Sequence, residues 1–216
     1  MSRGLGEVRR FGQLMAFALT LLVVLAISAS ARPAPPGVDP DWPCQARLVP
    51  KLAAVNYWSG PLDIRADWHA DPDIAKLVDR LGPRRVTTEE GLGAIAEFAK
   101  TLSGDRGPRL ALLFIGLLEQ TNLERAALIM KLKGIGRRQR ELADLVARLG
   151  DQLDAIPLSA SGDAAARRVD LQQRHDFTVR NFEEIQRTIR YACEDPVQLD
   201  ARLGAWARAL QKAASR

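Results

Sequence analysis

Apolar residues recur every three or four positions over most of the chain after residue 71, which is the spacing of one face of an α-helix. Asp71-Pro72 has the form of a helix start, and Thr87-x-x-Glu90 has the form of a capping box. The segment after Pro108 is apolar on most of its surface, which is typical of a helix in the middle of a bundle. The pattern predicts a helix in each of these three segments.

A longer apolar stripe covers residues 123–156 and ends at Pro157. Thr121-x-x-Glu124, just before it, is either another capping box or a chance match inside a continuing helix. After a polar turn, a second long helix is expected to return over residues 163–192, and Asp195-Pro196 begins a last helix. These segments predict a long antiparallel hairpin followed by a C-terminal helix.

The hairpin should extend beyond the other helices, because helices of roughly 30 residues reach about 45 Å. The stripe of the returning helix is thin around Gln172, Gln173 and Asp176. We therefore expect a polar, arginine-rich arm that projects from a compact base; the alternative is an arm that folds back and only adds stability. The base is expected to hold five large apolar residues: Leu113, Phe114, Leu117, Trp206 and Leu210.

No segment shows the alternation of a β-strand. The predicted fold class is therefore all-α: a helical bundle with a long antiparallel helical hairpin and an irregular, aromatic-rich N-terminal segment. Residues 42–216 are expected to form this single helical domain. Residues 32–41 are interpreted as a proline-rich leader, and residues 1–31 as a signal peptide.

Residues 1–31 have the three parts of an export signal. Arginines precede an uncharged apolar run over residues 14–29, and Ala29-Ser30-Ala31 places small residues at both recognition positions for cleavage. We expect cleavage before Arg32 and a periplasmic protein. The alternative is an uncleaved N-terminal helix that anchors the chain to the inner membrane, because the apolar run is close to the minimum spanning length.

The composition is that of an ordinary globular protein, with 47% of the 216 residues hydrophobic and 26% charged. The net charge is +5, but three of the 31 basic residues and only one of the 26 acidic residues lie within residues 1–31, so the rest of the chain carries +3. This small excess, together with the export signal, argues against nucleic acid as a partner.

The two cysteines, Cys44 and Cys193, both lie in the part of the chain expected to be exported. An even number of cysteines in an oxidising compartment favours a disulfide. Neither belongs to a C-x-x-C or C-x-x-C-H motif, which excludes a thioredoxin-like motif and standard haem attachment. We predict a Cys44–Cys193 disulfide that ties the N-terminal segment to the end of the returning helix.

The aromatic residues of the N-terminal segment include Trp42, Trp58 and Trp68. We interpret them as a cover over the helical core. The alternative is a ligand platform that also includes His69, because large aromatic side chains are common in binding sites.

Asp67, His69, Asp71 and Asp73 form an alternating stretch of side chains that can bind metals. Asp71 already has a role as a helix cap, however, and no H-x-x-x-H pair occurs. The chain also lacks G-x-S-x-G and G-x-x-x-x-G-K motifs. We therefore predict no metal site, no cofactor and no catalytic residue, which favours a protein that is not an enzyme.

A basic cluster is the densest charge feature of the chain. We interpret it as the solvated flank of a helix, with Glu141 and Asp144 as neighbours to pair with; the alternative is contact with anionic lipid headgroups or an acidic partner. Gly134-Ile135-Gly136 within it is interpreted as a helix kink or a point of close packing. The cluster consists of Lys131, Lys133, Arg137, Arg138 and Arg140.

Three short motifs occur early in the chain: Asp41-Trp42-Pro43-Cys44, Val49-Pro50 and Trp58-x-Gly60-Pro61. With them the chain resembles the start of a family of small uncharacterised exported proteobacterial proteins. That family has no established activity, so the resemblance implies export and transfers no site residue.

Together these observations favour a non-enzymatic periplasmic accessory or interaction protein, which uses the hairpin or the aromatic segment to hold a periplasmic protein partner. Contact with the membrane is expected only during export or weakly at the surface. The alternative is a periplasmic protein that binds a small ligand or a metal, or an enzyme without recognisable motifs.

Overall fold

The computed structural model describes residues 39–215, and the segment that begins at Asp39 forms one compact unit. The predicted signal peptide, residues 1–31, and residues 32–38 of the predicted leader lie outside the described residues. Among residues 39–215, no helix is long and apolar enough to cross a membrane.

The described residues form helices and no strand, which confirms the all-α fold class. Two short 3₁₀ helices, η1 (Ala54–Asn56) and η2 (Trp68–Ala70), interrupt an otherwise irregular N-terminal segment. The α-helices are α2 (Pro72–Leu81), α3 (Thr88–Thr101), α4 (Gly107–Asp154), α5 (Asp163–Ala192) and α6 (Glu194–Ala214).

The caps expected at the first two helices are present. The Asp71 side chain accepts hydrogen bonds from the backbone N–H groups of Asp73 and Ile74 at the start of α2. Thr87 and Glu90 form a reciprocal capping box at the start of α3. Both caps satisfy backbone donors that have no partner within their helix, and they confirm the predicted helix starts.

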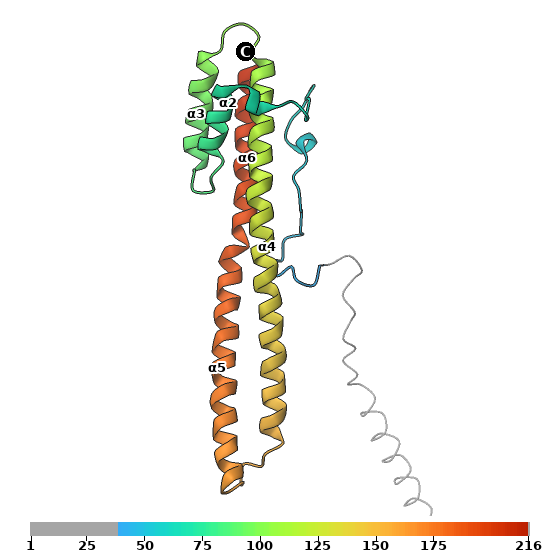
Figure 1. The fold of residues 1–216 in the computed structure, drawn as a ribbon, viewed down its shortest axis with the longest axis vertical. Coiled ribbons are helices and arrows are strands. Elements are labelled where there is room, and N and C mark those ends of the chain that lie inside the picture. Colours follow the sequence, from blue (N-terminus) through green and yellow to red (C-terminus); the bar gives the residue numbers. More distant parts are fainter. Residues whose placement is uncertain (1–38, 216) are drawn as a thin grey trace, which may run out of the picture. The chain divides into compact units, whose positions relative to one another are not determined.

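Helix α4 is one continuous helix of 48 residues, about 72 Å long. Thr121 lies buried in its interior, so the interpretation of Thr121-x-x-Glu124 as a chance match inside a continuing helix is confirmed. Figure 1 shows that α6 lies along the first half of α4 and α5 along its second half. The predicted antiparallel hairpin is thus formed by the second half of α4 and by α5.

Helices α5 and α6 follow each other almost without interruption. Cys193 is both the C-cap residue of α5 and the N-cap residue of α6, and its backbone is helical. Pro196 lies in the first turn of α6, where its missing N–H removes no necessary hydrogen bond. The two helices therefore form a nearly continuous rod that packs against α4.

We call residues 50–133 together with α6 the base. It contains the main hydrophobic core, to which α2, α3, α6 and the first half of α4 all contribute. The five residues predicted for this core are all buried in it: Leu113, Phe114, Leu117, Trp206 and Leu210.

A buried arginine reinforces the base. The Arg202 guanidinium donates hydrogen bonds to the carbonyl oxygens of Gly82, Pro83 and Val86, just after α2, and lies over the Trp206 ring at 4.6 Å from its centroid. These carbonyls belong to the turn between α2 and α3, where the helical hydrogen-bond pattern ends. Arg202 therefore joins α6 to that turn.

Candidate functional site

We call residues 134–154 of α4, the loop 155–162 and α5 the arm. Its two helices share a narrow seam. Along α5 only Leu171, Thr178 and Ile189 are buried, and Leu171 forms a small cluster with Leu149 and Leu153 of α4. A seam of this width suffices for two helices packed against each other and leaves their outer faces free.

The outer faces of the arm combine charged side chains with a few exposed apolar ones. Phe177 is 60% exposed and lies beside Leu145 and Leu149 in an open groove of about 380 Å³ between α4 and α5. Val169, two residues before Leu171, is also exposed. This surface takes little part in holding the fold together and is free to contact another molecule.

At the loop end, an arginine closes the arm. The Arg168 side chain donates hydrogen bonds of 2.6 Å to the carbonyl oxygens of both Leu153 and Ile156. These carbonyls lie at the C-terminal end of α4, where helical partners are missing. The end of α4 is thereby fastened to the start of α5.

At the other end of the arm, the N-terminal segment crosses the junction of arm and base. We call this junction, formed by residues 133–140 of α4 and by Cys193, the root. We call residues 39–46 the strap. Lys133 of α4 pairs with Asp39 at 2.6 Å, Arg137 pairs with Asp41 at 3.2 Å, and Arg140 pairs with Asp41 and with the carbonyl oxygen of Pro40. The Lys133 ammonium, which is hydrogen-bonded to Asp39, lowers the pKa of that carboxyl below its usual value.

These contacts change the interpretation of the basic cluster. Lys133, Arg137 and Arg140 face the acidic end of the chain's own leader, and none of them pairs with Glu141 or Asp144 among the described residues. No local pattern in the sequence predicts this pairing, because the acids lie about a hundred residues away along the chain.

The disulfide partners meet at this same root. The sulfur atoms of Cys44 and Cys193 lie 2.03 Å apart and their Cα atoms 5.6 Å apart, which confirms that the predicted pair stands at disulfide distance. Cys193 lies at the junction of α5 and α6, so the pair connects the strap to the point where the arm meets the base.

A groove of about 850 Å³ opens beside the two cysteines, between the strap and the helices. Four glutamine side chains line it: Gln45, Gln139, Gln186 and Gln198. Arg190 and Glu194 line it as well. Carboxamides both donate and accept hydrogen bonds, and these two side chains carry opposite charges, so the groove is suited to a polar group.

No family model, curated protein or solved structure matches this chain. The resemblance of its N-terminal motifs to exported proteobacterial proteins therefore stays a prediction. The assignment of a function rests on the geometry of the arm and of its root.

The structure separates the tryptophans that the sequence analysis grouped. Trp42 lies in the strap, and its indole N–H donates to the carbonyl oxygen of Ala46 at 2.7 Å. Trp58 stacks on Phe114 with ring centroids 5.0 Å apart, and Trp68 is 2% exposed. Trp58 and Trp68 belong to the base core, as their interpretation as a cover predicts, whereas Trp42 belongs to the root.

Trp68 is held on both sides. Its indole N–H donates to Glu119 at 2.9 Å, and its ring stacks on His69 at 3.6 Å between centroids. A Cβ atom at Gly116 would come within 3.0 Å of the Trp68 ring and 2.6 Å of Val78, so only glycine lets α4 approach this closely. His69 lies at the surface with its ring 3.2 Å from the Asp67 carboxylate.

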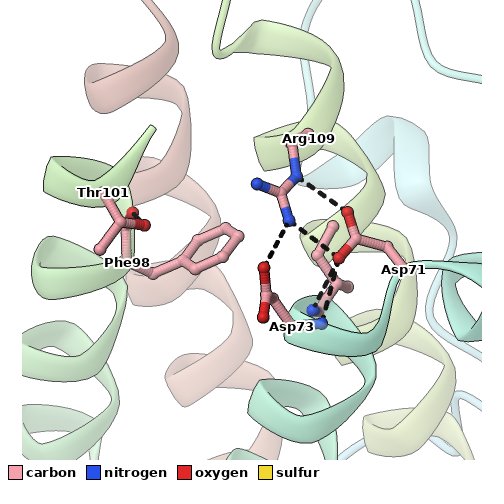
Figure 2. Close-up of polar contacts among 6 residues, drawn as sticks. Asp71, Asp73, Phe98, Thr101 and Arg109 are labelled. Carbon is pink, nitrogen blue, oxygen red and sulfur yellow. Dashed lines mark hydrogen bonds and ion pairs between the residues drawn. The ribbon is translucent and has the colours of Figure 1, made fainter. Parts of the chain in front are cut away.

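The acidic stretch 67–73 divides into two parts: Asp67 contacts His69, whereas Asp71 and Asp73 contact a basic residue of α4. Figure 2 shows Arg109 of α4 between Asp71 and Asp73: its guanidinium donates two hydrogen bonds of 2.8 Å to Asp71 and one of 3.2 Å to Asp73. The Phe98 ring faces the same guanidinium at 5.4 Å. Hydrogen bonds from Arg109 lower the pKa of Asp71.

Arg109 therefore takes the place that a cation would need. Within residues 39–215, no three metal-competent side chains converge on one point. The stretch joins α2 to α4 and serves the fold of the base.

Proposed function

We propose that this protein is a non-enzymatic periplasmic accessory or interaction protein and that it holds a protein partner with its helical arm. The observation that supports this proposal is the contrast within the arm: its helices bury only a narrow seam, while Phe177 and Val169 stay exposed among charged side chains. Exposed aromatic and apolar side chains with a polar surround are common in protein interfaces.

Export is part of the same proposal. A cysteine pair at disulfide distance is consistent with an oxidising compartment, and the predicted signal over residues 1–31 would bring the chain there. Intact mass of protein recovered from the periplasm tests it. We expect a chain that begins at or near Arg32, and a mass that includes Met1 would support the membrane-anchored alternative.

The arm is tested by removing it. Residues 142–181 are replaced by a short glycine-containing turn, which deletes the groove and the small leucine cluster and keeps the root. We expect this variant to keep its cooperative unfolding transition and to lose the protein that the full-length chain captures from a periplasmic extract of its natural host. Global unfolding of the variant would show that the arm is part of the core and that function is placed wrongly.

A double variant of the arm gives a finer test, and a double variant of the base is its matched control. Val169→Ser and Phe177→Ser remove exposed apolar side chains from the arm, whereas Val55→Ser and Ile64→Ser remove comparable ones from the base, where they are 81% and 66% exposed. We expect only the arm variant to lose capture of the partner. Equal loss in both variants would contradict a site on the arm.

A small-ligand protein is the second candidate, and the glutamine-lined groove at the root favours it. Its volume of about 850 Å³ falls within the range of ligand sites. Native mass spectrometry of protein purified from its host would then show a bound small molecule that Gln139→Ala and Gln186→Ala together remove. A spectrum without any bound species would argue against this candidate.

A further inference from the structure

The strap meets α4 through a matched set of charges. Lys133, Arg137 and Arg140 are four and three positions apart, so they lie on one face of the helix. They pair with Asp39 and Asp41, the two acids that flank Pro40. Each carboxylate is at least two-thirds buried, because their side chains are 30% and 24% exposed.

The contact is also shaped by the backbone. A Cβ atom added at Gly136 would lie 2.2 Å from the carbonyl oxygen of Asp41, a distance that no side chain tolerates. Gly136 therefore lets the strap approach the surface of α4 between Lys133 and Arg137. Close packing at Gly136, one of the two interpretations of this glycine, is confirmed.

The strap has an ordered conformation of its own. Asp39 accepts a backbone hydrogen bond from Trp42 at 3.1 Å, and its side chain accepts one from the Asp41 N–H at 2.9 Å. The Trp42 indole then bonds to Ala46, on the far side of Cys44. Placing the two acids on α4 therefore also places Cys44.

Cys44 and Cys193 are 149 residues apart in sequence, so their encounter in an unguided chain is entropically costly. In the structure the strap is docked on α4 and Cys44 lies at the junction of α5 and α6. We propose that the ion pairs of Asp39 and Asp41 with α4 are a latch that delivers Cys44 to Cys193, so that charge governs the formation and the reduction of this disulfide.

The chemistry takes place in two exchange steps. One cysteine thiolate attacks a small-molecule disulfide, forms a mixed disulfide and releases one thiolate. The second cysteine thiolate then attacks the protein sulfur of that mixed disulfide and releases the other thiolate. Both protein thiols are oxidised and one small disulfide is reduced. The latch acts on the second step, which is intramolecular and depends on the effective concentration of the two cysteines.

Thermodynamic linkage makes the effect reciprocal. Docking of the strap and formation of the disulfide favour each other by the same factor, so the ion pairs favour the disulfide to the extent that the reduced strap is undocked. The basic partners are 32%, 58% and 45% exposed, so each ion pair is weak on its own, and the three pairs together should change the equilibrium by about tenfold. This effect concerns the root alone and does not depend on whether the arm holds a partner.

The test uses the double variant Asp39→Asn with Asp41→Asn, and Asp151→Asn with Asp154→Asn on the arm as a control with the same change of charge. Reduced protein is incubated with oxidised glutathione at low salt, and mixed and intramolecular disulfides are counted by mass after rapid alkylation. We expect the intramolecular step to be about tenfold slower in the strap variant and unchanged in the control. About 1 M salt should slow the wild type to the same rate, because it screens the pairs.

A charge exchange separates the latch from a general loss of stability. Asp39→Lys and Lys133→Asp should each slow the step, and the two together should restore most of the rate. If the reduced chain does not fold, the preformed disulfide is reduced by dithiothreitol under native conditions, where the strap variant should react about tenfold faster. Equal rates for the wild type, the strap variant and the control, in the oxidation or in the reduction experiment, would overturn the proposal.

Discussion

The base and the arm share one helix and are held together very differently. In the base, α4 is surrounded by α2, α6 and the N-terminal segment, and side chains as large as Phe114 and Trp206 are completely buried. In the arm, the same helix has α5 as its neighbour, and the small cluster contains only Leu149, Leu153 and Leu171 as buried members. A long helix can therefore be core at one end and mostly surface at the other.

This difference has an energetic side. Each fully buried leucine contributes about 1.5–3 kcal/mol relative to an exposed one, so the base gathers far more apolar stabilisation than the arm. Segments with few buried contacts open at lower free energy than the global unfolding transition. The arm should thus be the less stable of the two regions and the base the part that determines cooperative unfolding.

The largest effect is expected where the two regions join. Cys44→Ser removes the connection between the strap and Cys193, and the chain-entropy estimate for a loop of 149 residues is about 5 kcal/mol, which is a ceiling because native strain reduces it. Urea unfolding of the variant and of Cys193→Ser should give the same loss. A loss below about 1 kcal/mol would show that the root is already held firmly without the covalent bond.

A leucine in the base comes next. Leu113 is completely buried, so Leu113→Ala should lower the free energy of unfolding by about 3–5 kcal/mol through lost transfer energy and a cavity that its rigid surroundings cannot fill. The measurement is equilibrium denaturation followed by fluorescence and by circular dichroism, and the two signals should show one shared transition.

The same substitution in the arm should cost less. Leu153→Ala removes a buried leucine from a cluster of three, which can collapse onto the space, so we expect about 2 kcal/mol or less. Its main effect should be local opening at the loop end rather than a shift of the global midpoint. Equal losses at Leu153 and Leu113 would contradict the distinction between arm and base.

A smaller effect is expected at Asp71. Asn keeps the helix cap but removes the charge that pairs with Arg109, so Asp71→Asn should cost about 1 kcal/mol at neutral pH. Because the pKa of Asp71 is lowered in the folded protein, its ion pair adds stability above the unfolded pKa of the group and loses it as the pH falls through the folded value.

The free energy of unfolding, measured as the pH is lowered, tests this contribution of the ion pair. The wild type should lose more stability than Asp71→Asn between neutral pH and about pH 3. Asp63→Asn serves as the control, because the Asp63 side chain is exposed and accepts a hydrogen bond from the backbone N–H of Arg65. Parallel curves for all three proteins would show that the Arg109 contact contributes nothing.

Local signals made most of the fold predictable. Asp71 and Thr87 mark helix starts through side-chain bonds to residues only two or three positions away, and periodicity identified the buried positions of α6 and of the first turns of α4. It was wrong further along α4: the predicted stripe includes Leu123 and Met130, which are 56% and 70% exposed, whereas Leu132 is buried. The two cysteines were also paired correctly, because only one pairing exists. In each case the information lies within a few turns of helix or in the number of cysteines.

Long-range contacts could not be predicted in the same way. No local pattern near Asp39 or Asp41 indicates a contact with α4, and none indicates that Arg202 is buried against the turn after α2. The three tryptophans were grouped by sequence distance, whereas the structure places Trp42 at the root and the others in the base. Such contacts depend on how the helices pack, which no local pattern records.

Hydrogen exchange on the intact, oxidised protein tests the distinction between the two regions most directly. Backbone amides of α4 near Leu149 and of α5 near Leu171 should exchange at least about a hundredfold faster than those near Leu113 and Leu203, because the arm opens without the base. Equal protection in both regions, lost together as denaturant is added, would contradict the account and show a single cooperative core.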